Sequence, residues 1–195
     1  MKRLNVGCGT DIRKGFVNLD KVKLPGVNVI HDLNKFPWPF KDNEFDFINC
    51  DQILEHLDDI PRCLREIWRI SKKGSKTHIA VPHYASPGAW FDLTHKHPFG
   101  WMSLDYMAAN EIHKHSLGRR HSHEYGDKER FNILKRHYIF GKLHKFIGIS
   151  IFAHQHPFFY EVFNLCYILS PKHIEFDIET VKEAKNNEIK NTKIN

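Results

Sequence analysis

The chain has 195 residues, of which 41% are hydrophobic, and this size and composition predict one globular domain with a buried core. The composition excludes an intrinsically disordered chain, and no apolar run is long enough to cross a bilayer. Lys and Arg exceed Asp and Glu by 29 to 23, which gives a formal net charge of +6. The four cysteines form no CxxC pair and the N-terminus has no apolar signal segment, so we expect a cytoplasmic protein with reduced thiols.

In chain order, the first half alternates short apolar runs with turn-rich connections, which predicts an α/β fold. The predicted strands are 4–6, 17–19, 27–30, 45–49 and 77–81. Between the last two strands, apolar residues at helical spacing predict an amphipathic helix over 60–70. Lys72, Lys73 and Gly74 are expected to close this helix.

The second half is less regular. A helix is predicted over 101–109, and a strand is predicted from Phe131 onward. Residues 142–169 are rich in aromatic and apolar side chains, and two interpretations stay open, a lid over a site or a part of the core. Residues 174–181 alternate apolar with acidic side chains, which predicts a half-buried strand, and 182–195 is predicted to be a tail.

The excess positive charge lies in one stretch, residues 113–145. This stretch has nine Lys or Arg and three acidic residues, and nine minus three equals the +6 of the whole chain. The simpler interpretation is a solvated basic face. The alternative is a surface that attracts an anionic partner such as a nucleic acid.

The first predicted strand ends in a turn of Gly7, Cys8 and Gly9. Glycine has no Cβ, so the backbone there can approach a ligand closely. Asp20 ends the second predicted strand, where a carboxylate can accept both hydroxyls of a ribose. A dinucleotide fingerprint needs an acid about 20 residues after the glycines and a third glycine, so the shorter spacing here disfavours an NAD enzyme.

Acidic residues also follow the third and fourth predicted strands. Asp32 and Leu33 come after the third strand, where a carboxylate can bind the exocyclic amine of an adenine and the next backbone N–H can meet a ring nitrogen. Asp51 comes after the fourth strand. Because the carboxyl ends of parallel strands meet at one edge of a sheet, these residues are expected to share a crevice.

Seven segments stand in an order that resembles the class I S-adenosylmethionine (SAM)-dependent methyltransferases: GCGT, NLD, HDL, PFKDNEFD, ILEHL, EIWRISKKG and IAVPH. The short first connection and the later FDLTHKHPF segment are similar to small methyltransferases linked to polysaccharide or cell-surface biosynthesis. The resemblance implies a Rossmann-like, doubly wound, mostly parallel sheet of seven strands in the order 3-2-1-4-5-7-6. It also implies a single domain over residues 1–181, with the 142–169 segment as an insertion.

The resemblance implies SAM as the cofactor and S-adenosylhomocysteine as its product. The residues it assigns to the cofactor are Gly7, Cys8 and Gly9 at the turn, Asp20 at the ribose, Asp32 and Leu33 at the adenine, and Asp51 near the methionine part or the substrate. Two positions depart from the family pattern. Asn5 replaces the usual acid before the first glycine, and Asp11 replaces the usual third glycine, which predicts a modest affinity for SAM.

Three histidines are predicted to act on the methyl acceptor as general bases, because histidine titrates near neutral pH: His56, His83 and His95. Packing at a helix start is the alternative for His56, and a hydrogen bond to a backbone carbonyl is the alternative for His95. The 15 histidines include four HxH pairs, but these pairs lack the partner spacing of a metal site, so no metal is predicted.

The expected reaction is transfer of a methyl group from SAM to an oxygen or nitrogen acceptor. The resemblance favours a sugar or small metabolite as the acceptor. One alternative is an RNA methyltransferase, which the basic stretch favours. The other is a SAM-binding or partner-binding module without catalysis.

Overall fold

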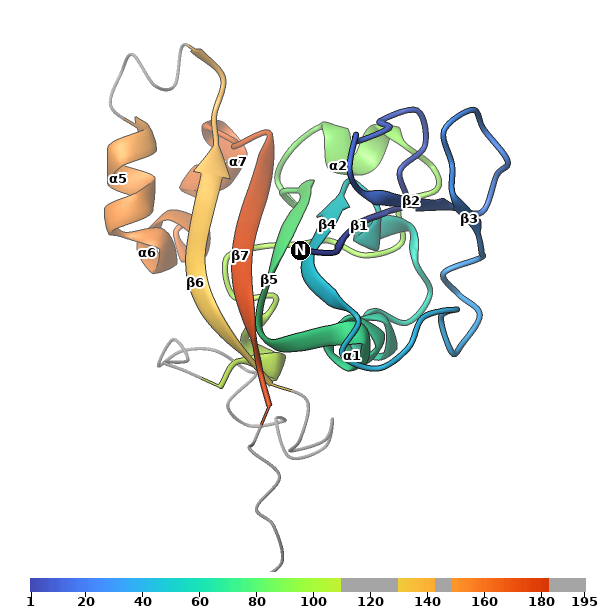
Figure 1. Ribbon diagram of the computed structural model, residues 1–195. Coiled ribbons are helices and arrows are strands. Elements are labelled where there is room, and N and C mark those ends of the chain that lie inside the picture. The colour runs from blue at the N-terminus through green and yellow to red at the C-terminus, as the bar shows by residue number, and fades with distance from the viewer. Residues whose placement is uncertain (110–129, 143–148, 183–195) are drawn as a thin grey trace, which may run out of the picture.

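The computed structural model describes residues 1–109, 130–142 and 149–182, which form one seven-stranded sheet (Figure 1). The strands are β1 (Arg3–Val6), β2 (Val17–Asp20), β3 (Val29–Ile30), β4 (Phe45–Asp51), β5 (Ser71–Pro82), β6 (Arg130–Ile139) and β7 (His173–Val181). Their order, β3-β2-β1-β4-β5-β7-β6, confirms the predicted one. Neighbouring strands are parallel except where β7 pairs with β5 and β6. Most of the basic stretch and the tail after residue 182 lie outside the described residues.

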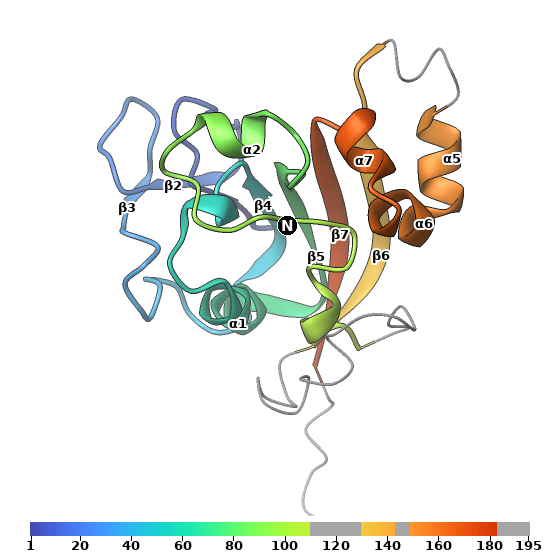
Figure 2. The same cartoon turned by 180° about the vertical axis from the view of Figure 1, so that it is seen from behind.

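The helices are short apart from the first. They are α1 (Ile60–Ile70), α2 (Gly88–Phe91), α5 (Ile149–Gln155), α6 (Pro157–Val162) and α7 (Leu165–Ile168), with 3-10 turns at η1 (Leu54–His56) and η2 (Asp105–Met107). Helix α1 begins and ends at the predicted residues. The Asp59 carboxylate caps it by accepting a hydrogen bond from the Arg62 N–H at 2.9 Å. Its buried face packs on the sheet near the start of β5 (Figures 1 and 2).

The core lies along the central strands. Alternate side chains of β7 are buried, including Ile174, Phe176 and Ile178, as the predicted half-buried strand requires. In β1, Leu4, Asn5 and Val6 are buried in succession, so both faces of the sheet are covered at its centre. All four cysteines are free and buried. Within the described ranges, no helix is long and apolar enough to span a membrane.

Two local predictions are wrong. Residues 101–109 form only the η2 turn, because tertiary contacts fix the chain there: the Trp101 N–H donates to the Glu161 carboxylate at 2.8 Å, and buried Asp105 pairs with Arg136. Residues 72–74, which were expected to close helix α1, belong to β5 instead, since that strand starts directly after the helix.

The segment predicted as a lid or core holds α5, α6 and α7, inserted between β6 and β7. These helices stand beside β6, at the opposite side of the sheet from β3 (Figures 1 and 2). Several apolar side chains of this segment are exposed, including Phe159, Phe163 and Ile168. Their position keeps them outside the pockets described below.

Candidate cofactor site

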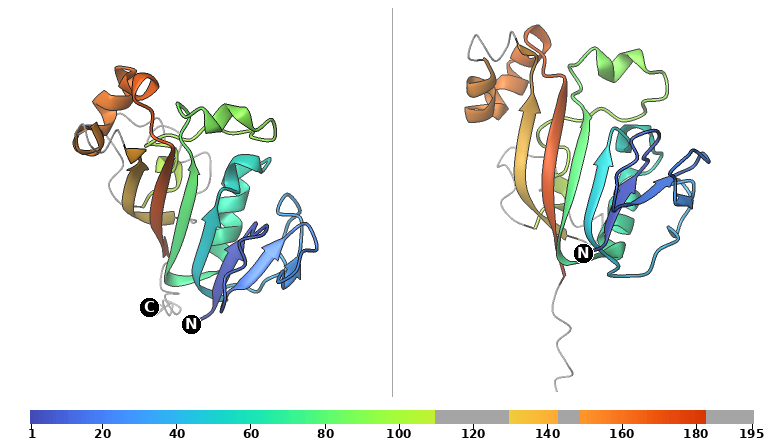
Figure 3. Two further views of the ribbon diagram at one scale, coloured as in Figure 1. Left: turned by 90° about the horizontal axis from the view of Figure 1, so that it is seen from above. Right: turned by 45° about the horizontal axis from the view of Figure 1, so that its top comes forward.

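The carboxyl ends of β1, β2 and β3 meet around one pocket of about 650 Å³. Figure 3 shows β1, β4 and β5 running the same way, with α2 beyond the carboxyl ends of β4 and β5. The pocket is lined by Gly7, Asp20, Lys21, His31, Asp32, Leu33, Asn34, Gln52, Ile53, His56, Leu57, Leu93, Thr94 and Lys96. Four of the residues predicted to bind the cofactor therefore gather at one place.

Gly7 stands where the end of β1 approaches the chain after β4. Its φ is +62°, and a Cβ added there would lie 2.3 Å from Cγ1 of Ile53. Only glycine fits both the backbone conformation and this close approach. The glycine therefore brings bare backbone to the pocket wall, as the sequence predicts.

Asp20 is tied to the glycine turn. One carboxylate oxygen accepts a hydrogen bond from the Gly9 N–H at 2.8 Å, and the other accepts one from the Val22 N–H at 2.9 Å. A carboxylate has about four lone-pair positions, so two remain for hydroxyl donors in the pocket. The two backbone bonds hold the carboxylate in place before any ligand arrives.

Asp32 and Leu33 form the next part of the wall. The His31 N–H donates to the Asp20 carbonyl at 2.9 Å, which fixes the chain after β3 against the end of β2. The Asn34 N–H donates to the Asp32 carboxylate at 3.1 Å. Leu33 is buried, and its carbonyl accepts a hydrogen bond from the buried Trp38 indole at 3.1 Å.

A second pocket of about 280 Å³ adjoins the first, because both are lined by Gly7 and Gln52. The rest of its lining is Asn5, Cys8, Asp11 and Asp51. The Arg13 guanidinium pairs with both carboxylates of this pocket, at 2.7 Å from Asp11 and 3.3 Å from Asp51. A positive charge therefore lies next to the two acidic side chains that line this pocket.

Asn5 lies in a buried network of amides across three strands. Its side-chain amide donates to the Asp11 carbonyl at 2.7 Å, and its side-chain oxygen accepts from Asn49 at 3.0 Å. Asn18 extends the network at 3.3 Å. At this position the chain therefore has a neutral residue that holds the glycine turn, and the acidic groups come from Asp11 and Asp51 instead.

His56 and His95, 39 positions apart, lie together. Their ring centroids are 4.7 Å apart, and the Thr94 hydroxyl lies 2.8 Å from His56 Nδ1. Burial lowers the pKa of His56, and the neighbouring His95 adds to this effect. Nδ1 of His95 lies 3.1 Å from the Ala89 carbonyl, so the predicted alternative for this residue, a backbone hydrogen bond, is present.

His83 lies apart from these two and is fully buried. Its Nδ1 accepts a hydrogen bond from the Ala85 N–H at 3.2 Å, and its Nε2 then donates to the Glu161 carboxylate at 3.0 Å. Both ring nitrogens are therefore occupied. Proton transfer by His83 would require one of these bonds to open.

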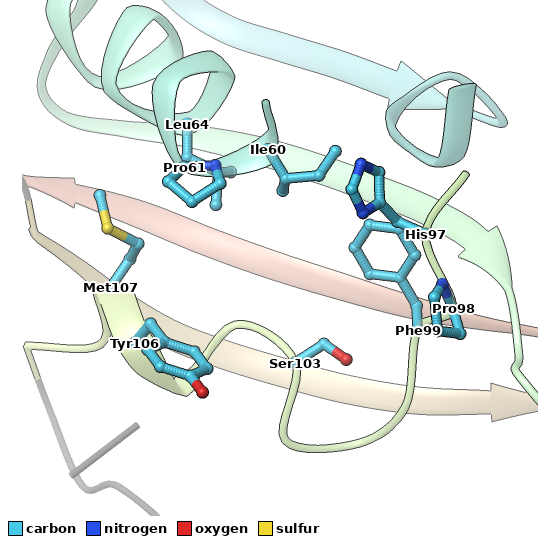
Figure 4. A pocket seen from close by; sticks show the side chains of 9 residues that line it. All are labelled: Ile60, Pro61, Leu64, His97, Pro98, Phe99, Ser103, Tyr106 and Met107. Carbon is cyan, nitrogen blue, oxygen red and sulfur yellow. The ribbon is translucent and has the colours of Figure 1, made fainter. Parts of the chain in front are cut away.

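A third pocket, of about 250 Å³, lies between α1 and the chain that follows the FDLTHKHPF segment (Figure 4). Figure 4 shows Ile60 and Leu64 of α1 on one side and Tyr106 and Met107 on the other. His97, Pro98 and Phe99 also line it. Leu93, Thr94 and Lys96 line the large pocket, so one segment reaches both cavities.

Glu55 is a candidate site residue that the sequence pattern did not single out. This carboxylate is buried beside His56, and burial raises its pKa to about 7. The signal available in the sequence was its place directly before His56 in ILEHL. The role of Asp11 was also missed, because it was taken only as a departure from glycine.

Comparison with known proteins places this edge of the sheet in a known domain. Residues 3–79 match the family described as "Methyltransferase domain". An uncharacterized protein of Methanocaldococcus jannaschii is 32% identical over 84 residues, and the aligned part spans 41% of this chain and 38% of that protein.

Two solved structures share the fold at low sequence identity. A SAM-dependent methyltransferase from Archaeoglobus fulgidus has a TM-score of 0.55 and 18% identity, with 91% of this chain and 86% of that chain covered. The cyclase SpnF has a TM-score of 0.51 and 16% identity, with 93% and 75% covered. Residues 3–79 therefore match a methyltransferase domain, and the described chain has the fold of these two structures.

Proposed function

We propose that this protein transfers a methyl group from SAM to an oxygen or nitrogen acceptor. One observation carries the proposal: the tips of three successive strands deliver Gly7, Asp20 and Asp32 to a single pocket of about 650 Å³. A volume of this order suits a nucleoside-sized ligand. SAM brings the reactive methyl group on a positively charged sulfur. The protein therefore has to bind SAM and orient the acceptor toward that methyl group.

Each part of SAM has a complementary group in the two adjoining pockets. The preset Asp20 carboxylate would accept the ribose hydroxyls, and Asp32 with the Leu33 N–H would meet the adenine. The smaller pocket would take the methionine part, where Asp11 and Asp51 suit the ammonium and Arg13 suits the carboxylate. The methionine part would also contact the turn formed by Gly7, Cys8 and Gly9.

We propose a sugar or small metabolite as the acceptor. The resemblance of FDLTHKHPF to methyltransferases linked to polysaccharide biosynthesis supports this class. The same segment lines both the large pocket and the 250 Å³ pocket, which links cofactor and acceptor recognition. A role of His56, His83 and His95 toward the acceptor stays a prediction, and among them His56 lines the large pocket.

Calorimetry with SAM, followed by transfer of a tritiated methyl group from SAM into a cell extract, tests the proposal. We expect binding of one SAM per chain and label in a small, acid-soluble product. Binding without transfer to any acceptor would favour the alternative of a non-catalytic SAM-binding module.

RNA is the alternative acceptor, and its support is the basic stretch. Of the described cations in that stretch, the Arg130 guanidinium donates to the Tyr106 carbonyl at 3.0 Å and Arg136 pairs with Asp105. An RNA acceptor predicts binding that weakens steeply as salt is added. A small acceptor predicts no salt-sensitive RNA binding, which a filter assay over a range of salt concentrations measures.

Asp20→Ala should weaken SAM binding by about 1–3 kcal/mol, which is about 5- to 150-fold in the dissociation constant, because the ribose hydroxyl donors lose a charged, half-buried acceptor. Calorimetry measures the change. Asp42→Ala is the matched control, since Asp42 lies before β4 at the opposite edge of the sheet and pairs with Arg69. Equal affinity in the Asp20 variant and the wild type would remove this carboxylate from the site.

A further inference from the structure

The carboxylate of Glu55 is buried at an energetic cost that its described surroundings do not offset. Its side chain is 1% exposed, and neither carboxylate oxygen has a hydrogen-bond partner in another described residue. A buried carboxylate without a partner costs several kcal/mol unless it is neutralised or bound to a cation. The buried carboxylate therefore requires either a proton or a bound cation.

His56 and His95 flank this carboxylate. One ligand atom from each of the three side chains lies within 4.8 Å of the other two. An ion with bonds of about 2.0–2.1 Å holds tetrahedral ligand atoms about 3.4 Å apart, so small side-chain rotations bring the three together. Within the described residues, no Lys or Arg side chain donates a hydrogen bond to the Glu55 carboxylate.

The surrounding contacts fix the tautomers of both rings. Nδ1 of His95 faces the Ala89 carbonyl and must donate. The Thr94 hydroxyl donates to Asp92 at 2.7 Å, so it accepts from Nδ1 of His56. In the neutral rings Nε2 then carries the lone pair on both histidines. Carbonyl and carboxylate groups behind metal-binding histidines orient the ligands in the same way.

We propose that Glu55, His56 and His95 bind a divalent metal ion of the zinc class. Two imidazoles and one carboxylate are the protein ligands of many open zinc sites, and imidazole suits first-row metals such as Zn²⁺ and Co²⁺. His56 lines the 650 Å³ pocket, so the ion lies at the pocket's border. There it would act as a Lewis acid toward an acceptor hydroxyl.

This site changes the roles predicted from sequence. His56 and His95 become ligands rather than general bases, and a metal site forms although no HxH pair makes one by itself. Glu55 supplies the third ligand from the residue directly before His56. Metal binding at these residues requires no SAM, so its failure would leave the proposed function untouched.

Titration of the chelator-treated full chain with Co²⁺, followed by its visible absorption, tests the site. We expect one tightly bound Co²⁺ with a low-coordinate spectrum, and displacement by one equivalent of Zn²⁺. Glu55→Gln should weaken this binding at least about tenfold, as should His95→Gln. The Gln variant at Glu55 keeps all 15 histidines, so it separates the site from metal bound by surface imidazoles.

His156→Gln is the control, because His156 is exposed in the insertion and belongs to one of the HxH pairs. Its affinity should equal that of the wild type. Glu55→Gln removes a buried charge, so we expect that variant to keep its fold by circular dichroism and to lose the rise in melting temperature that Zn²⁺ gives the wild type. Unchanged Co²⁺ affinity in Glu55→Gln or in His95→Gln would overturn the proposal.

Discussion

Gly7→Ala is expected to abolish measurable SAM binding and to lower the free energy of unfolding by about 2–4 kcal/mol. The new Cβ would lie 2.3–2.9 Å from three side-chain carbons of Ile53, and φ at this position is +62°. Ile53 must move, and it lines the large pocket. Denaturant unfolding measures the stability, and calorimetry measures the binding of SAM.

Gly9→Ala is the matched control for this substitution. Gly9 has a similar φ of +48°, but nothing lies within 4 Å of an added Cβ. The free energy of unfolding of this variant should fall by only about 1 kcal/mol, which is the cost of placing a Cβ at a positive φ. Equal losses of stability in both variants would mean that the contact with Ile53 has no energetic importance.

Glu161→Ala is expected to lower the free energy of unfolding by about 3–5 kcal/mol. One carboxylate oxygen of Glu161 accepts hydrogen bonds from His83 Nε2, the Trp101 N–H and the Tyr138 hydroxyl, at 2.8–3.0 Å. These donors lie directly after β5, in the loop between α2 and η2, and on β6, so the substitution leaves three largely buried donors without an acceptor. It also releases α6 from the sheet.

Glu161→Gln separates the loss of acceptor from the loss of charge. The amide keeps a carbonyl oxygen for the same donors, so we expect only about 1–2 kcal/mol of destabilisation. Denaturant unfolding of both variants gives the comparison. If the Ala and Gln variants were equally stable, the three hydrogen bonds would not be what anchors the insertion.

The fold was largely predictable because its signals are local or ordered along the chain. The bounds of α1 follow from apolar spacing, and β7 follows from strict alternation. The strand order came from the resemblance and is confirmed. The prediction of a helix over 101–109 was wrong because Glu161 and Arg136, both distant in sequence, fix that segment.

The site was predictable to the extent that it consists of strand ends. Gly7, Asp20 and Asp32 come together because strands β1–β3 are parallel and adjacent, an order that the family resemblance implies. The position of strand ends does not identify Glu55, since its burial without a hydrogen-bond partner depends on how η1 packs. The contact of Thr94 with His56 spans 38 positions and has no local signal.

The structure of a co-crystal with S-adenosylhomocysteine tests the central claim most directly. We predict the ribose hydroxyls at the Asp20 carboxylate and the adenine beside Asp32 and Leu33, with the homocysteine part reaching toward Asp11 and Asp51. A nucleoside bound elsewhere on the chain, or a co-crystal whose strand-end pocket holds no ligand, would contradict the account.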